Sequence, residues 1–186
     1  MKKLLLSAVL AASFVALSAN AATTSSGTIT VTGKVVSSTC NVTFNGVQSP
    51  TITLPTYDTN TLTSGVSAGW TPVTMALTGC AAVTSPAATT VFPYFTGSNI
   101  DTVSGYLKNA TGAGNSNVEI AFSTTQSLTG ALSLNQGSGA QGAGTMNLTG
   151  TGSNASVTYY AGYVAYGANA TAGNVNTNVQ YALNYQ

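Results

Sequence analysis

The sequence predicts an all-β sandwich built as one domain of the 186-residue chain. Short runs rich in Val, Ile, Thr, Tyr and Phe are separated by clusters of Gly, Asn, Ser and Pro, a pattern typical of such sandwiches. No stretch has the periodicity of a long amphipathic helix, and the length suits a single domain.

Each run that combines β-forming residues with flanking turn residues is expected to be a strand. Pro93 interrupts one of these runs, so that strand is expected at a sheet edge or with a bulge, because proline cannot donate to a ladder. Residues 137–154 are rich in Gly, Ser and Asn, and we expect a mobile hairpin or loop there. The expected strands are 28–36, 40–44, 51–54, 73–77, 90–95, 118–123, 130–134, 156–166 and 175–185.

Charge is sparse along the whole chain. There are 4 Lys+Arg, 3 Asp+Glu and no His, so 4% of the residues are charged, against roughly 25% in an ordinary domain. A net charge of +1 offers no basic surface for nucleic acid. The lack of His excludes His-dependent triads and zinc-hydrolase sites. Asp58, Asp101 and Glu119 are widely separated, so we expect no enzyme, no metal and no cofactor.

The amino terminus has the layout of a secretory signal peptide. Met1, Lys2 and Lys3 form a positive start, residues 4–17 are apolar, and residues 19–21 read Ala-Asn-Ala, a small-residue cleavage site. The apolar run is shorter than the roughly 20 residues that span a bilayer. We therefore expect residues 1–21 to be cleaved and the chain to be exported.

Cys40 and Cys80 are the only cysteines, and an oxidising compartment would join them. A redox site or half of a metal site is less well supported, because there is no CxxC motif and no histidine. A structural disulfide is expected.

The carboxyl end alternates between mostly apolar and mostly amide side chains. Because successive side chains of a strand point to opposite faces, residues 175–185 are expected to form a strand with one apolar face. An ordinary terminal strand against the core would show the same pattern. The odd positions are Val175, Thr177, Val179, Tyr181, Leu183 and Tyr185, and the even positions are Asn or Gln except for Ala182.

Residues 27–35 alternate in the same way near the other end. Ile29, Val31, Gly33 and Val35 share one face, opposite threonines and Lys34. The segment could simply be the first strand of the domain's own sheet. Gly33 is unusual in that case, because glycine inside a strand often marks the close approach of another surface.

These termini resemble those of type 1 fimbrial major subunits, which belong to the chaperone–usher pilin family. Residues 27–40, GTITVTGKVVSSTC, are similar to the family's amino-terminal extension and first strand. The segment from Gly173 to the end has the family's closing motif, with a glycine fourteenth from the end and an aromatic, Tyr185, in the penultimate position. The cysteine spacing agrees as well, whereas residues 86–152 are compatible only in length.

The resemblance implies an incomplete immunoglobulin-like β-sandwich that lacks its last strand and is completed by donor-strand exchange. It divides the chain into a signal peptide (1–21), a donor-strand extension running into the first strand (22–36) and the sandwich domain (37–186). Ile29, Val31 and Val35 would be the apolar plugs of the donor strand, and Gly33 would meet a pocket too shallow for a side chain. The acceptor edge, which would also meet the chaperone, would comprise Gly173, Val175, Val179, Tyr181, Leu183 and Tyr185.

The function implied is that of a structural pilin, the repeating subunit of a fimbria that supports cell adhesion. Its partners would be copies of itself in a head-to-tail polymer, a periplasmic chaperone and an outer-membrane usher. The chain would pass through the periplasm to the cell surface. Two alternatives remain: a minor or adaptor pilin of the same system, and a secreted monomeric binding module that uses Trp70 or the tyrosines in residues 159–166.

Overall fold

The computed structural model of the chain describes residues 30, 40–80, 90–110, 117–148 and 153–186. The chain divides into two compact units, Met1–Lys34 and Val35–Gln186, and the fold below is that of the second. The predicted signal peptide, the donor residues Ile29, Val31, Gly33 and Val35, and the strand expected at 28–36 lie outside the described residues, apart from Thr30. Within the described part, no helix is long and apolar enough to cross a membrane.

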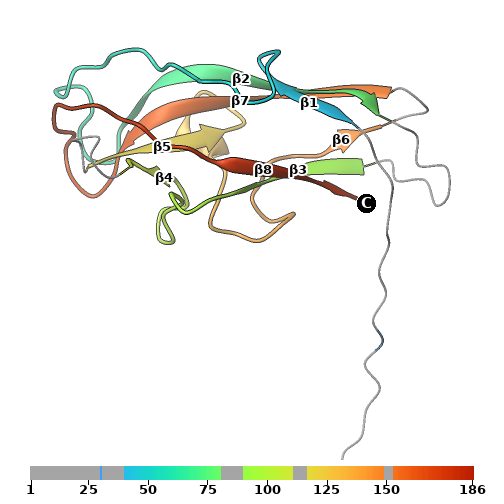
Figure 1. The fold of residues 1–186 in the computed structure, drawn as a ribbon. Helices are drawn as coiled ribbons and strands as arrows, with labels where there is room; N and C mark the ends of the chain where they lie inside the picture. The colour runs from blue at the N-terminus through green and yellow to red at the C-terminus, as the bar shows by residue number, and fades with distance from the viewer. Residues whose placement is uncertain (1–29, 31–39, 81–89, 111–116, 149–152) are drawn as a thin grey trace, which may run out of the picture. The chain divides into compact units, whose positions relative to one another are not determined.

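Two antiparallel sheets form a sandwich, which confirms the all-β prediction (Figure 1). One sheet has the strand order β1-β2-β7-β5-β4 and the other has the order β6-β3-β8. A short 3-10 helix, η1 (Leu128–Gly130), follows β5. The strands are β1 (Asn41–Phe44), β2 (Ser67–Cys80), β3 (Thr90–Thr96), β4 (Leu107–Lys108), β5 (Val118–Ser123), β6 (Met146–Asn147), β7 (Ser153–Ala165) and β8 (Gln180–Tyr185).

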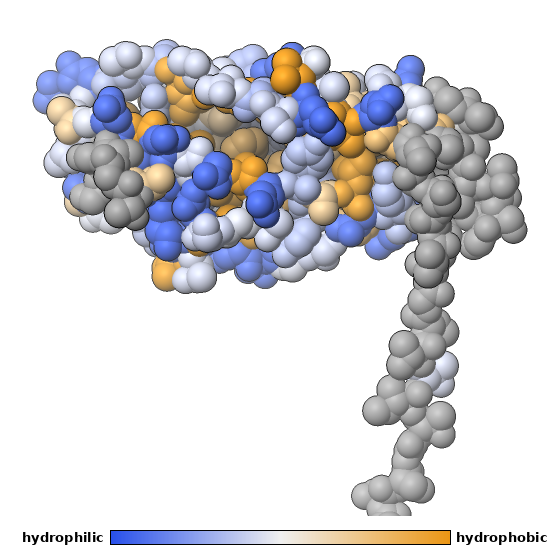
Figure 2. Space-filling view, viewed as in Figure 1, coloured by the Kyte–Doolittle hydropathy of each residue, from blue (hydrophilic) through white to orange (hydrophobic). Residues whose placement is uncertain are grey.

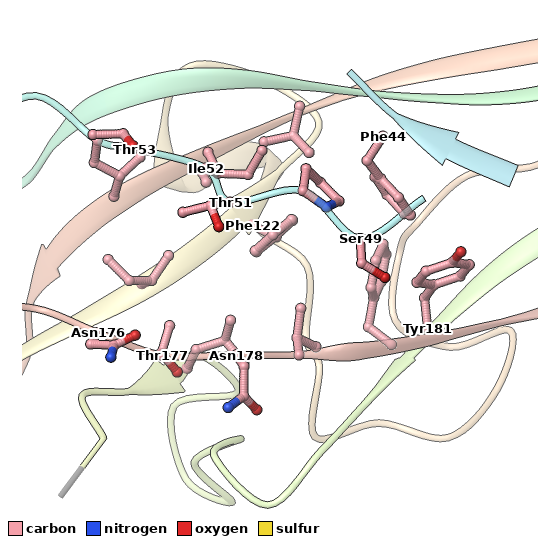
Figure 3. A pocket seen from close by; sticks show the side chains of 18 of the residues that line it. Phe44, Ser49, Thr51, Ile52, Thr53, Phe122, Asn176, Thr177, Asn178 and Tyr181 are labelled. Carbon is pink, nitrogen blue, oxygen red and sulfur yellow. The ribbon is translucent and has the colours of Figure 1, made fainter. Parts of the chain in front are cut away.

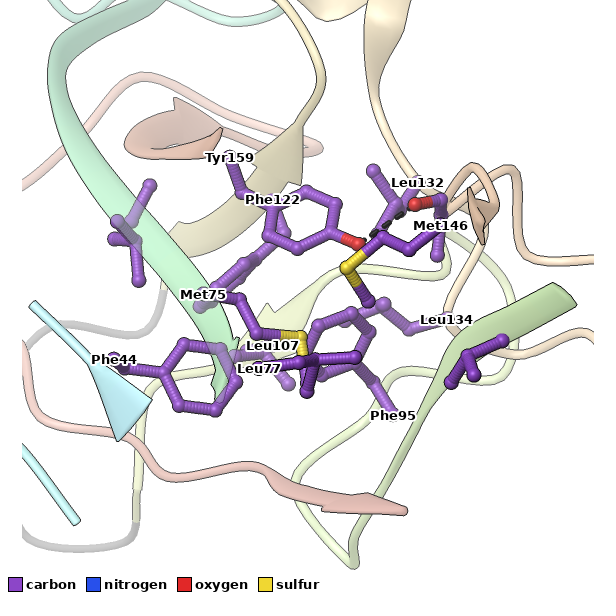
Figure 4. Packing of buried hydrophobic residues seen from close by; sticks show 14 of the residues in the cluster. Phe44, Met75, Leu77, Phe95, Leu107, Phe122, Leu132, Leu134, Met146 and Tyr159 are labelled. Carbon is purple, nitrogen blue, oxygen red and sulfur yellow. Dashed lines mark hydrogen bonds between the residues drawn. The ribbon is translucent and has the colours of Figure 1, made fainter. Parts of the chain in front are cut away.

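The core lies between the sheets and is built by alternate residues of the long strands (Figure 4). In β2, Val73, Met75 and Leu77 are buried. Because side chains alternate along a strand, these three point to the same face. Val73 pairs with Tyr159 of β7, whose side chain is fully buried. The hydroxyl of Tyr159 donates a hydrogen bond to the main-chain oxygen of Ala143, 2.6 Å away.

The predicted disulfide is confirmed. Cys40 and Cys80 are bonded, with their Cα atoms 4.1 Å apart. Cys40 directly precedes β1 and Cys80 ends β2, and these strands are paired. The disulfide therefore ties the start of β1 to the end of its neighbour β2.

The prediction that Pro93 lies in an edge strand or at a bulge was wrong, because β3 is the middle strand of its sheet and pairs with β8 in a continuous register. Thr90 and Gln186 exchange both main-chain hydrogen bonds, and hydrogen-bonded pairs recur at every second residue. Pro93, paired with Leu183, therefore points its nitrogen away from β8. On that other side β6 pairs only with Thr90 and Val91, so proline removes no ladder bond.

Residues 137–154 were expected to form a mobile hairpin or loop, and the described residues 137–148 form a loop around the two-residue β6 that is anchored to the core. Gln141 is only 2% exposed, and its Nε2 donates to the main-chain oxygens of Phe95 and Leu134, 2.7 and 2.8 Å away. Its Oε1 accepts a hydrogen bond from the N–H of Phe95. Met146 and Leu148 are buried in the core. One amide side chain thus takes the place of a strand beside β3, beyond the end of β6.

Two expected strands do not form, and two strands were missed. In residues 130–134, the N–H groups of Leu132, Ser133 and Leu134 bond to Phe122, Gln141 and Gly105. These acceptors belong to different segments, so no ladder results. β4 and β6 have only two residues each and show no readable periodicity. The other expected strand that fails, 51–54, borders the groove described next.

Candidate functional site: a groove beside the last strand

A groove of about 630 Å³ opens between residues 48–54 and residues 175–181 (Figures 2 and 3). Apolar residues gather in this hollow, between more polar rims. We call the two sides the proximal wall (48–54) and the C-terminal wall (175–181). The floor is core, formed mainly by Val73, Phe95, Leu107, Ile120, Phe122 and Ala161.

The C-terminal wall has the two faces that the sequence predicts. Val175, Thr177, Val179 and Tyr181 are half-buried, whereas the even residues between them are exposed. The apolar members of this set pack against the core. β8 itself begins only at Gln180, so 175–179 extends its line without belonging to a ladder.

The main-chain N–H and C=O groups of the even residues of this wall point towards the side on which β3 lies. Beyond the Thr90–Gln186 pair, the main-chain oxygen of Asn176 accepts from the N–H of Ala110, 2.6 Å away. The side chain of Asn109 bonds both Asn174 and Asn176, and that of Asn99 donates to the oxygen of Asn178. Beyond the end of β3, the side chains of Asn99 and Asn109 therefore bond this side of the wall in place of a paired strand.

The odd residues turn their main chain the other way, because N–H and C=O directions alternate along a strand. The main-chain groups of Val175, Thr177 and Val179 bond to no described residue. The only described strand that pairs with β8 is β3, and its main-chain hydrogen bonds go to the even residues of β8. The C-terminal wall thus presents an open strand edge to the groove.

The proximal wall presents a second unpaired edge. Ile52 and Leu54 are half-buried against the core, and Thr51 and Thr53 are exposed, so the burial pattern is that of a strand. No main-chain group in residues 48–54 bonds to a described residue. This explains why the strand expected at 51–54 does not form. Its side chains alternate as in a strand, but the groove lies where a pairing strand would have to be.

Two open edges above an apolar floor form a site for an added strand. Main-chain hydrogen bonds to an edge provide affinity, and alternate side chains entering pockets provide specificity. An open edge of this kind is also prone to unwanted pairing. The groove therefore suits an extended peptide with apolar residues at every second position.

Thr177 is the exception in the C-terminal wall. Its hydroxyl oxygen is buried and has no hydrogen-bond partner among the described residues. The inward positions beside it, Val175, Val179 and Tyr181, are all packed against the core. A buried hydroxyl without a partner is unfavourable, so this position differs chemically from its neighbours.

The predicted acceptor residues do not all lie together. Val175, Val179 and Tyr181 line the groove. Leu183 and Tyr185 lie further along β8, opposite Pro93 and Val91, and pack against the core. Gly173 is exposed and does not line the groove. Thr177, the floor and the proximal wall were not predicted as parts of the site, although the alternation in Pro50-Thr51-Ile52-Thr53-Leu54 was a readable signal for that wall.

The carboxylates of Asp101 and Glu119 accept hydrogen bonds that stabilise a turn. Ser104 connects Asp101 and Glu119: its N–H donates to Asp101 at 3.0 Å, and its hydroxyl donates to Glu119 at 2.6 Å. Hydrogen bonds from the main-chain N–H groups of Ser104 and Val103 lower the pKa of Asp101. Burial raises the pKa of Glu119, which is 6% exposed. Neither carboxylate lines the groove.

Three of the aromatic residues considered for a binding module are used in packing. Tyr159 is fully buried. Trp70 lies against the main chain of Gly162, where an added Cβ would be 2.5 Å from the indole. Tyr163 packs edge-on against Tyr57, with ring centroids 6.3 Å apart. Of the other tyrosines in this set, Tyr160 is half-buried and Tyr166 is 41% exposed.

Comparison with known proteins identifies the family to which the chain belongs. Residues 15–186 match the family model described as Fimbrial protein. The chain is 38% identical over 162 residues to the F17 fimbrial protein of Escherichia coli, covering 86% of this chain and 87% of that one. It is 37% identical over 175 residues to the major fimbrial subunit SMF-1 of Stenotrophomonas maltophilia (strain K279a), covering 91% and 96%.

Solved structures show the same fold. A subunit in a chaperone–usher pilus structure matches with a TM-score of 0.57 at 18% identity, covering 88% of this chain and 97% of that chain. The P pilus rod subunit PapA matches with a TM-score of 0.53 at 18% identity, covering 79% and 99%. The sandwich is the incomplete immunoglobulin-like fold of such pilins. The chain therefore belongs to the fimbrial protein family and is a structural subunit of surface pili, not an enzyme.

Proposed function

We propose that this chain is the repeating shaft subunit of its fimbria and that residues 27–36 of a neighbouring copy fill the groove. The observation that carries the proposal is the pair of main-chain edges above an apolar floor that bond to none of the described residues. A strand inserted between them adds to the β6-β3-β8 sheet and bonds the odd residues of the C-terminal wall.

The segment 27–36 has the pattern that such an occupant needs. Its inward positions are 29, 31, 33 and 35, three of them aliphatic. The C-terminal wall offers four inward positions over the same length, at 175, 177, 179 and 181. Each aliphatic side chain that leaves water contributes about 1.5–3 kcal/mol, and each ladder hydrogen bond about 0.5–1.5 kcal/mol.

Joining of this kind produces a filament. The groove and the donor segment are different parts of one chain, so contacts between copies are head-to-tail and do not close. The relative from S. maltophilia is named a major fimbrial subunit, which favours a shaft subunit over a minor or adaptor pilin.

The groove also explains why the chain would need assembly factors. Before a neighbouring copy arrives, an apolar groove beside an open strand edge favours aggregation. We include in the proposal a periplasmic chaperone that covers the groove with its own strand and an outer-membrane usher at which residues 27–36 replace that strand. The predicted signal peptide supports export through the periplasm.

An unheated detergent gel tests the proposal. The chain from Ala22 onward, purified from the cell surface, is expected to give a ladder of multiples that collapses on boiling. A matched variant without residues 22–35 is expected to give no ladder, yet to bind a synthetic peptide of residues 27–36. A single monomer band from the complete chain, or a ladder from the truncated variant, would overturn the proposal.

A further inference from the structure

We infer that a second cleft, on the outer face of the β6-β3-β8 sheet, binds a neutral saccharide. The cleft has a volume of about 350 Å³ and shares only Phe95 with the groove. Only the repetition of this site along a shaft, which would turn weak single sites into strong attachment, rests on the proposed function. The lining residues that carry the inference are Tyr94, Thr96, Thr102, Asn135, Gln136 and Gly137.

The cleft lies on the side of β3 that faces away from the core. Phe95 packs in the core against Phe122 and Tyr159, with ring centroids 5.7 and 5.5 Å away. Because side chains alternate along a strand, Tyr94 and Thr96 point to the opposite face, where both are half-buried. A strand that fills the groove is added beside β8 and does not cover this face.

The two loops that border the cleft are fastened to each other and to β3. Nδ2 of Asn135 donates a hydrogen bond to the main-chain oxygen of Thr102, 3.0 Å away, and so joins one loop to the other. Gln141 holds the loop of Asn135 in place, because its Nε2 donates to the main-chain oxygens of Phe95 and Leu134. The walls are therefore formed before a ligand arrives, which lowers the cost of ordering them on binding.

The chemistry of the lining suits a sugar. Tyr94 provides an aromatic ring whose face can pack against the C–H groups of a sugar ring. The hydroxyls of Tyr94, Thr96 and Thr102 bond to no other described residue, so they are available to the hydroxyl groups of a ligand. The exposed amide of Gln136 adds a further donor and acceptor. An apolar surface with a few convergent polar groups is the usual composition of a small-molecule site.

The absence of charge in the lining selects a neutral ligand. None of the described residues that line the cleft is charged. The carboxylate of Asp101, next to Thr102 in the sequence, is already bonded to the N–H groups of Val103 and Ser104 at 2.7 and 3.0 Å. An acidic sugar would therefore lose water at its carboxylate without gaining a cation as partner.

A peptide added as a strand is not favoured at this cleft. Tyr94 and Thr96 pair with residues of β8, and the main-chain N–H and oxygen of Phe95 both bond to the side chain of Gln141. Because β3 has no open main-chain edge here, a ligand must be held by side chains rather than by strand addition. The volume lies near the lower end of the roughly 300–1,000 Å³ of small-molecule sites, which suits one or two sugar rings.

Saturation-transfer NMR on intact fimbriae from the cell surface tests for the ligand. The probes are lactose, maltose, chitobiose and mannobiose, with sialyllactose as the charged counterpart of lactose. We expect at least one neutral disaccharide to receive saturation from the fimbriae and sialyllactose to bind no better than lactose. The proposal is overturned if none of the four neutral probes binds, or if sialyllactose binds more tightly than all of them.

Variants then test the location. Tyr94→Ala is expected to weaken binding at least about tenfold, whereas Tyr94→Phe keeps the ring and most of the affinity. Gly137→Phe is expected to fill the cleft and abolish binding without disturbing assembly, because a Cβ added at Gly137 meets no atom within 4 Å. The matched control is Tyr166→Ala, which removes a tyrosine that is 41% exposed and does not line the cleft, and it should bind as the parent does.

The outcomes separate this site from the proposed function. Parental binding by both Tyr94→Ala and Gly137→Phe, or an equal loss in Tyr166→Ala, would place the saccharide elsewhere and overturn the inference. If Gly137→Phe gives no fimbriae, the comparison of Tyr94→Ala with Tyr94→Phe decides in the same way. A missing heat-sensitive ladder in the parent fimbriae would count against the proposed joint and leave the saccharide measurement valid.

Discussion

The N–H of Asn176 donates a hydrogen bond to Oδ1 of Asn109, 2.9 Å away, and Nδ2 of the same asparagine donates to the main-chain oxygen of Asn174 at 3.0 Å. One side chain thus bonds the main chain as a neighbouring strand would. These bonds matter for the groove. Because they fix the even residues of the C-terminal wall, the main-chain groups of Val175, Thr177 and Val179 point into the groove.

Replacing Asn109 tests that role. Asn109→Ala removes at least these two hydrogen bonds and is expected to lower the free energy of unfolding by about 1–2 kcal/mol. It should also weaken binding of the 27–36 peptide, because the wall must then be ordered on binding. Calorimetric titration measures the second effect. Asn109→Asp keeps the acceptor for Asn176 and should be less damaging, so equal peptide affinity in all three chains would contradict the role.

Gln141 is expected to be one of the least replaceable polar residues. Gln141→Leu keeps much of the volume but leaves both main-chain groups of Phe95 without their partner, and unpaired buried groups cost about 1–3 kcal/mol each. Urea unfolding should show a loss of about 2–4 kcal/mol. The control is Gln126→Leu, at an exposed position, which should change stability by less than about 0.5 kcal/mol. Similar losses in both variants would argue against the bonding role.

Glu119 should make stability fall as the pH rises. Burial raises its pKa above the ordinary 4.5, so the folded chain holds the proton more tightly than the unfolded chain does. Its contribution is therefore favourable below pH 4.5 and is lost as the pH rises through the folded pKa. Glu119→Gln is expected to be more stable than the parent chain at pH 7 and to show a flatter profile above pH 4.5.

Asp101 provides the matched comparison, because its pKa is lowered. Its contribution is present above its ordinary pKa of 3.8 and is lost as the pH falls through the folded pKa. Asp101→Asn should therefore reduce the loss of stability in acid. Superimposable pH profiles for the parent chain and both variants, measured by urea unfolding, would contradict both assignments.

Removing the disulfide should loosen the first strand. The double change Cys40→Ser with Cys80→Ser opens a long loop and is expected to lower the free energy of unfolding by about 3–4 kcal/mol. β1 leads directly into the proximal wall, so peptide binding should weaken too. Thermal unfolding with and without reductant checks the parent chain in the same experiment, and an unchanged melting temperature would refute the expectation.

Local pattern was enough to predict much of the sandwich. β3, β5 and β7 are rich in Val, Ile, Tyr and Phe, and all three were predicted within a few residues. The disulfide followed from two cysteines and an export signal. The inward and outward faces of residues 175–181 followed from alternation alone, because side-chain direction in a strand depends only on position.

Pairing was not predictable in the same way. Alternation in residues 51–54 shows which side chains face the core, but it carries no information about whether a neighbouring strand exists. The two-residue strands β4 and β6 depend on long-range contacts, not on their own sequence. Gln141 looked like part of a polar loop, since nothing local indicates that its amide would reach Phe95.

Amide hydrogen exchange in the presence of the 27–36 peptide tests the central claim most directly. The chain without residues 22–35 is compared with and without saturating peptide. We expect the main-chain amides of Val175, Thr177 and Val179 to become strongly protected, while that of Asn176, already bonded to Asn109, changes little. Unchanged exchange at the three odd residues, despite bound peptide, would show that no strand is added at this edge.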